Sequence, residues 1–135
     1  LKQDPKGQWY GFGKCWQRHV DDCLDRIEAL HEAHGAGSIS VELNADKGYL
    51  AKELKNRGFK VRAYHEKMNK FIKISTYLRQ VWPNLLWTDD TDPEYIAQIL
   101  DYTEFAEHDD CPDSAASLVR QMLKKASFNN VAGGI

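Results

Sequence analysis

Segments that favour β-strands alternate with segments that favour helices along this chain, and this alternation limits the possible folds more than any other feature. The run SISVEL at 38–43 is short and rich in β-branched residues, and FKVRAY at 59–64 alternates apolar with polar side chains. Each run lies next to a stretch in which apolar residues recur at helical spacing. The pattern predicts an α/β domain, in which helices flank a mixed β-sheet.

The N-terminal segment is predicted to add an antiparallel hairpin to this sheet. DPKG at 4–7 is a turn signal, so residues 1–3 would end one strand and the aromatic-rich residues 8–16 would form the next. Helices are predicted at 18–34, 45–57, 67–82, from 93 onward and at 112–125, with a short strand at 85–87.

Size and composition indicate a globular protein. The 135 residues, 42% of them hydrophobic, suit one domain. No run approaches the ~20 apolar residues that span a bilayer, so no membrane partner is expected. The cysteines Cys15, Cys23 and Cys111 are odd in number and form no CxxC pair. They therefore argue against a disulfide framework or a zinc site, and favour a reducing compartment.

Charge is unevenly distributed, although the net charge is only −2. Residues 52–79 hold nine of the 18 basic side chains against two acidic ones, whereas residues 80–119 hold ten of the 20 acidic side chains and no basic one. This separation suggests one surface for a polyanion and one site for cations. The alternative is that both stretches are ordinary solvated faces.

Glu42 ends an otherwise apolar strand immediately before a predicted helix. Ligands of α/β folds gather at the carboxyl ends of strands, and a buried carboxylate is costly unless it is paired or bound to a cation. Glu42 is therefore a candidate functional residue. The alternative is that it faces water or bonds to a neighbouring backbone group.

A second acidic site lies in AEHDDCPDSAASL at 106–118, where Asp109, Asp110 and Asp113 crowd the start of the last predicted helix. Pro112 fits the first helical position there. Capping explains one carboxylate, because one cap needs one acceptor. Three carboxylates repel each other, and a divalent cation relieves that repulsion most simply.

The ligand types point to a particular metal chemistry. Hard oxygen ligands without cysteine favour Mg²⁺ or Mn²⁺, as one ion or two. His108 adds a possible proton carrier or substrate contact. If Glu42 and the aspartates converge, the site can activate water against a phosphodiester, and the basic stretch nearby in sequence suggests a nuclease.

Three motifs in this order resemble the C-terminal nuclease domain of the large terminase subunit of tailed bacteriophages. They are SVELNADKGYLAKEL, KMNKFIKI and EFAEHDDCPDSAASL, and the resemblance runs from Gln8 to about Lys125. The positions that match are Glu42, Asn44 and Gly48 in an E-x-N-x-x-G-like context, Asn69 and Lys70 at a helix start, and His108, Asp109, Asp110 and Asp113, followed by Ser114 and Ala115, in an H-D-D-x-x-D-A-like motif.

The resemblance implies an RNase H-like fold, similar to ribonuclease H and retroviral integrase. It implies a Mg²⁺- or Mn²⁺-dependent endonuclease that cuts concatemeric double-stranded DNA of a phage or prophage during genome packaging, in the cytoplasm of the bacterial host. The implied partners are an ATPase domain, a small terminase subunit and the portal or procapsid. By position, the resemblance implies that Glu42 and Asp110 are catalytic metal ligands and that Asp109 is adjacent to them. Asp113 would be a metal ligand or would contact one, and His108 would be near the site. The residues expected to face DNA are Lys67, Asn69, Lys70 and Lys73.

One departure from the family pattern limits the expected activity. The family's first catalytic aspartate lies on a strand that would precede Leu1, and Asp4 in the turn is a poor substitute. Residues 1–135 are therefore interpreted as one RNase H-like domain without its first strand and without an upstream ATPase domain. Such a truncated domain is expected to cut DNA poorly or not at all. The alternatives are a non-catalytic DNA-binding or docking module of the same fold, and a junction-resolvase-like nuclease.

Overall fold

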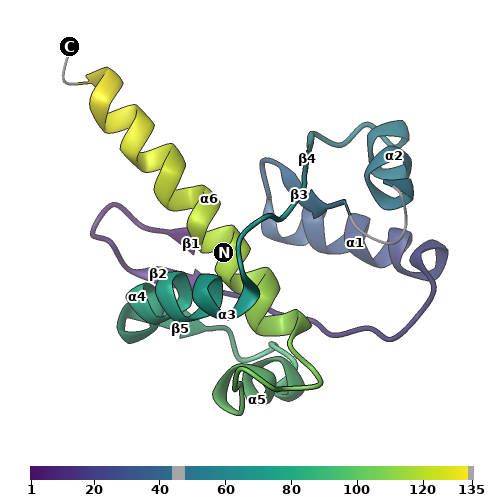
Figure 1. The fold of residues 1–135 in the computed structure, drawn as a ribbon. Coiled ribbons are helices and arrows are strands. Elements are labelled where there is room, and N and C mark those ends of the chain that lie inside the picture. Colours follow the sequence, from purple (N-terminus) through teal and green to yellow (C-terminus); the bar gives the residue numbers. More distant parts are fainter. Residues whose placement is uncertain (44–47, 134–135) are drawn as a thin grey trace. The chain divides into compact units, whose positions relative to one another are not determined.

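The computed structural model describes residues 1–43 and 48–133, with side chains up to residue 125. It is a mixed α/β structure, as the alternating segments predict (Figure 1). Its described strands form a three-stranded and a two-stranded sheet, however, and not the single mixed sheet that the sequence predicted. The chain divides into two compact units, one made of Leu1–Cys15 and Met68–Ile135 (unit 1) and the other of Trp16–Lys67 (unit 2). Each unit has its own apolar core.

Unit 2 contains two helices and a pair of parallel strands. Helix α1 (Val20–His34) leads to β3 (Ile39–Glu42), and α2 (Tyr49–Asn56) leads to β4 (Val61–Tyr64). The two strands pair in parallel, with Glu42 opposite Tyr64, as expected when a helix connects neighbouring strands. The apolar positions that define these elements in the sequence form the core, which contains Leu24, Val41, Ala51 and Leu54.

Unit 1 begins with the predicted hairpin, formed by β1 (Lys2–Gln3) and β2 (Trp9–Gly11). Asp4 closes the turn because its Oδ1 accepts hydrogen bonds from the backbone N–H groups of Lys6 and Gln8. On its other side β2 pairs in parallel with β5 (Leu85–Trp87). The strand predicted over 8–16 is thus shorter than expected.

The predicted helix over 67–82 is a composite. It consists of α3 (Lys70–Lys73), a π-helical turn η1 (Ile74–Leu78), α4 (Arg79–Val81) and a 3₁₀ turn η2 (Trp82–Asn84). Asn69 caps its start, because the Asn69 side chain accepts a hydrogen bond from the backbone N–H of Ile72 at 3.1 Å. The helical segment then passes directly into β5.

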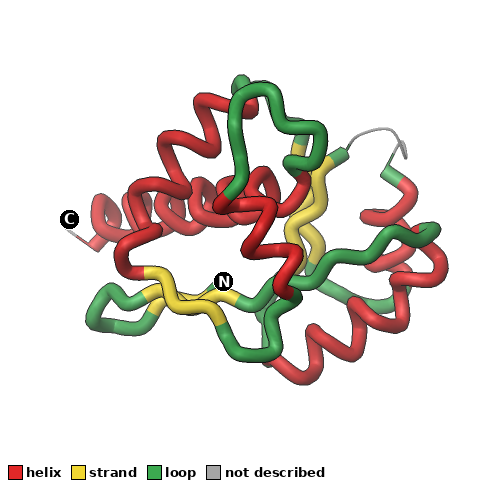
Figure 2. Tube along the Cα trace, turned by 90° about the horizontal axis from the view of Figure 1, so that it is seen from below, coloured by secondary structure: helices red, strands yellow, loops and turns green. Residues whose placement is uncertain are grey.

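The last two helices are α5 (Pro93–Leu100) and α6 (Asp110–Gly133), which pack against each other (Figure 1). Helix α6 is the red helix that leads to the end marked C in Figure 2. Helix α6 starts two residues before the predicted start, so Pro112 lies inside its first turn rather than at its first position. Proline is tolerated there because the first backbone N–H groups of a helix have no partner within it. Among the helices of the described residues, none is long and apolar enough to cross a membrane.

Tyr95 of α5 joins three parts of the unit 1 core. Its ring lies 5.4 Å from that of Trp87, and its hydroxyl group is 2.7 Å from Oγ of Ser114 on α6. A Cβ atom added to Gly13 would stand 2.5 Å from the Tyr95 ring, so only glycine fits at that point. Burial raises the pKa of the Tyr95 phenol to about 12.

We expect Gly13→Ala to destabilise the protein by roughly 1–3 kcal/mol, because the added methyl group overpacks the core against a buried ring. Gly37→Ala is the matched control, since a Cβ atom there meets no atom within 4 Å. Urea unfolding measures both. Equal midpoints for the two variants would contradict the assigned contact.

We also expect stability to fall between pH 10 and pH 12 through Tyr95. The folded-state pKa of about 12 is above the ordinary value of 10.0, so the stabilisation is complete below pH 10 and is lost as the pH rises through 12. Tyr95→Phe removes this titration. Thermal unfolding across this range should show a steeper loss for the wild-type protein than for Tyr95→Phe, and parallel losses would refute the assignment.

Candidate functional site

The acidic residues at the start of α6 face α3, and the two segments meet through charged side chains. Asp109, Asp113 and Ser117 are spaced four residues apart, which places them along one side of the helix. Lys70 and Lys73 are spaced three apart and lie on one side of α3. The result is a row of alternating charges that runs from the surface into the core of unit 1.

Lys73 forms the buried end of this row. It is 0% exposed, and its Nζ lies 2.7 Å from Oδ1 of Asp113, which is itself 7% exposed. The same Nζ donates a hydrogen bond to Oγ of Ser117 at 2.8 Å. A buried ammonium group is tolerated only when it is paired and hydrogen-bonded, and here both conditions are met.

Lys70 forms the outer end of the row. Its Nζ lies 3.1 Å from Oδ1 of Asp109 and 3.9 Å from Oδ2 of Asp113. Burial lowers the pKa of the Lys70 ammonium group, but the bond to Asp109 and the nearby carboxylates outweigh this effect and raise that pKa above its ordinary value. Lys70 is still partly exposed, with 45% of its side-chain surface open to solvent.

The two lysines therefore supply positive charge where the sequence predicted a cation. Asp113 has one carboxylate oxygen against Lys73 and the other near Lys70, which leaves it poorly suited to be a metal ligand. Asp110 and His108 are exposed, and Asp109 is partly exposed. Within the described part of the chain, no three His, Cys, Asp or Glu side chains form a group that could hold a metal ion.

Glu42 occupies the predicted position at the carboxyl end of β3, where it is half-buried. The Asn44 position of the same motif is outside the described residues. Gly48 precedes α2 with a φ of +84°, a left-handed conformation that favours glycine. Glu42 belongs to unit 2, whereas the aspartates belong to unit 1.

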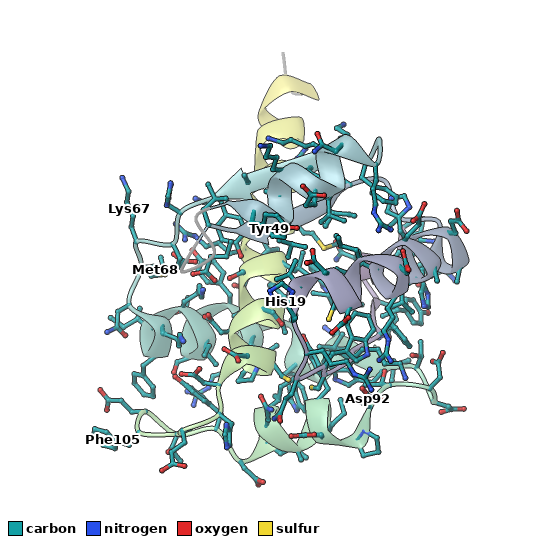
Figure 3. The ribbon with its side chains drawn as sticks, turned by 90° about the vertical axis from the view of Figure 1, so that its right-hand side faces the viewer. His19, Tyr49, Lys67, Met68, Asp92 and Phe105 are labelled. Carbon is teal, nitrogen blue, oxygen red and sulfur yellow. The ribbon has the colours of Figure 1, made fainter. Side chains whose placement is uncertain are left out.

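The residues predicted to face DNA have different environments. Lys67 is exposed where the chain passes from unit 2 to Met68, and its side chain projects away from the ribbon in Figure 3. Asn69 is exposed and caps α3. Lys73 requires a correction: its buried ammonium group is enclosed with Asp113, so it is not accessible to a phosphate group.

The rest of the basic stretch is mainly at the surface. Arg57 is bound on α1 by Asp25 at 2.8 Å and by Glu28 at 2.9 Å. Six further basic residues of 52–79 are exposed: Lys52, Lys55, Lys60, Arg62, Lys67 and Arg79.

Ser117 is the participant that the sequence reasoning missed. The spacing of Asp109, Asp113 and Ser117, opposite two lysines three residues apart, is a signal that could have revealed the row. No protein-family model, curated protein or solved structure matches this chain.

We expect Lys73→Met to cost about 3–5 kcal/mol in unfolding free energy, because it leaves the Asp113 carboxylate buried and poorly compensated. Lys67→Met, at an exposed position, is the control and should change stability little. The double variant Lys73→Met with Asp113→Leu should recover much of the loss, because it removes both charges. Equal stabilities for Lys73→Met and Lys67→Met, measured in urea, would show that the pair is not buried in solution.

Proposed function

We propose that this chain is an RNase H-like nuclease domain of the terminase large-subunit type, which cuts double-stranded DNA with Mg²⁺ or Mn²⁺. The observation that carries the proposal is the arrangement at the start of α6. There, the partly exposed Asp109 and the exposed Asp110 provide adjacent carboxylates, and Lys70 lies against Asp109. These residues belong to the motifs on which the resemblance rests.

The RNase H-like fold is part of the proposal, and the element order supports it. A hairpin is followed by helix, strand, helix and strand, with β3 and β4 parallel, and the chain ends in a long helix that begins with the acidic motif. An acidic residue at the end of a parallel strand, as Glu42 is, fits the same family pattern.

The donor set fits a hard divalent cation in part. Asp109 and Asp110 supply carboxylate oxygens, the ligands that Mg²⁺ and Mn²⁺ favour. Glu42 stays a separate candidate ligand in unit 2. Asp113 is left out of the proposed ligand set because both of its oxygens lie near lysines. A bound ion would supply charge stabilisation and an activated water at the phosphodiester.

The chain's own residues have separate tasks in this proposal. Ser117 accepts a hydrogen bond from Lys73, and Lys73 in turn pairs with Asp113. Asp113 then helps to hold Lys70 near Asp109. Lys70 has a partly exposed ammonium group that can contact a DNA phosphate beside the acidic residues. His108, exposed next to Asp109, is the proposed proton carrier.

A second candidate function is a DNA-binding or docking module without catalysis. It is favoured by the ion pairs of Lys70 with Asp109 and of Lys73 with Asp113, which use carboxylates of the acidic motif. In this function, the exposed lysines and arginines of 52–79 would contact phosphates, and affinity would fall steeply with salt.

Plasmid nicking in Mn²⁺ tests the proposal, using the longest natural form of the protein that carries this chain. We expect Glu42→Gln and Asp110→Asn to reduce cutting by at least about 100-fold, because each removes a carboxylate of the proposed catalytic set. Glu104→Gln, at an exposed acidic position before α6, is the control and should cut like the wild-type protein.

Binding to duplex DNA at low salt, measured in parallel, separates the two functions. Cutting that depends on Glu42 and Asp110 supports the nuclease. Salt-sensitive binding without cutting supports the binding module. Cutting that is unchanged in both variants, or no DNA affinity even at low salt, would contradict the proposed nuclease.

A further inference from the structure

Cys15 and Cys111 form a close pair of thiols in unit 1. Their Sγ atoms are 2.8 Å apart, within 1 Å of the ~2.05 Å length of a disulfide bond. Both cysteines are reduced in this structure. Cys15 is half-buried, whereas Cys111 is buried in the first turn of α6. Neither sulfur atom belongs to the carboxylate and lysine groups that carry the proposed function, although Cys111 follows Asp110 in the chain.

Hydrogen bonds hold the backbone of each cysteine in place. The N–H of Cys15 donates to Oδ2 of Asp92 at 2.9 Å, and Lys14 donates to the other oxygen of Asp92 at 3.1 Å. Asp92, labelled in Figure 3, precedes α5. The N–H of Cys111 donates to Oε1 of Gln98 on α5. Both backbones are hydrogen-bonded to α5 or to Asp92, the residue before it. These hydrogen bonds keep the two sulfur atoms close together.

We propose that Cys15 and Cys111 form a redox-responsive pair, which low-molecular-weight disulfides convert to an intramolecular disulfide. The half-buried Cys15 sulfur, as thiolate, attacks the reagent, the reagent's S–S bond breaks, and one reagent thiolate leaves and takes up the proton lost by Cys15. The Cys111 sulfur then attacks Cys15 Sγ in the mixed disulfide, and the second reagent thiolate leaves with the proton of Cys111. Two protein thiols are oxidised, and one reagent disulfide is reduced to two thiols.

The consequence of this bond follows from how unit 1 is built. The unit consists of two separate pieces of the chain, and Cys15 is the last residue of the first piece. The disulfide would join that piece covalently to the start of α6, at the residue that follows Asp110. Oxidation would therefore tie the N-terminal hairpin to the helix that carries the acidic motif.

The experiment uses the full chain with 2-hydroxyethyl disulfide and 2-mercaptoethanol as the probe couple. This disulfide is uncharged, which avoids repulsion by the acidic residues near Cys15. After acid quenching and alkylation, trypsin separates the cysteines, because Cys15 falls in peptide 15–18, Cys23 in 19–26 and Cys111 in 80–120. Peptide masses then report which sulfur atoms are joined.

We expect peptides 15–18 and 80–120 to be linked, with a mass lower by two hydrogens, while Cys23 forms only a mixed disulfide. The total reagent concentration is held fixed while the disulfide-to-thiol ratio is varied. The linked pair should be half-formed at a ratio at least about 10-fold lower than the ratio at which Cys23 is half-converted to its mixed disulfide. The reason is that the bond between Cys15 and Cys111 forms within one folded unit and is therefore intramolecular. Cys23→Ser should leave this midpoint unchanged.

Cys15→Ala and Cys111→Ala should each abolish the linked peptide. If either variant folds poorly, the disulfide-to-thiol ratio at which the linked pair is half-formed in the wild-type protein still tests the proposal. Independent mixed disulfides at Cys15 and Cys111, or a link that includes Cys23, would overturn the proposal.

Discussion

The buried ion pair between Lys73 and Asp113 is the interaction on which the rest of unit 1 depends. It joins the segment that follows unit 2 to the first turns of α6, and Ser117 completes the hydrogen bonding of the ammonium group. A buried pair of this kind contributes less to stability than to specificity, because desolvation offsets much of its attraction. Its main effect is to fix which side of α6 faces α3.

That orientation decides which carboxylates are available for chemistry. Asp113 is turned toward the lysines, whereas Asp110 is exposed and Asp109 shares its charge with Lys70. The three aspartates are close in sequence but have different environments, so they can have different roles. The proposed nuclease uses Asp109 and Asp110 at the surface and relies on Asp113 only to position Lys70.

Much of the secondary structure was predictable from residue patterns. The helix at Val20–His34, the strand at Leu85–Trp87 and the N-terminal hairpin follow from apolar spacing and turn residues, which act locally. The ends of the elements were less predictable. Pro112 was expected at the first helical position, yet it lies inside the first turn, because several positions there tolerate the missing N–H.

The acidic residues of the candidate site could be predicted from the sequence, but their ion pairs with lysines could not. The acidic motif was evident, but the burial of Lys73 depends on contacts between segments that are 40 residues apart in the chain. A sequence-based analysis assigns a lysine to solvent because isolated buried charges are costly. The same limit applies to Cys15 and Cys111, whose proximity is a property of the folded unit.

The most direct measurement is the NMR line broadening caused by substoichiometric Mn²⁺, because a paramagnetic ion selectively broadens the resonances of nearby nuclei. The proposed function predicts that the backbone amides of Asp109 and Asp110 lose intensity first, and that Asp110→Asn removes the effect. Broadening that leaves the start of α6 unaffected, or that persists unchanged in Asp110→Asn, would contradict the proposed cation site and the nuclease built on it.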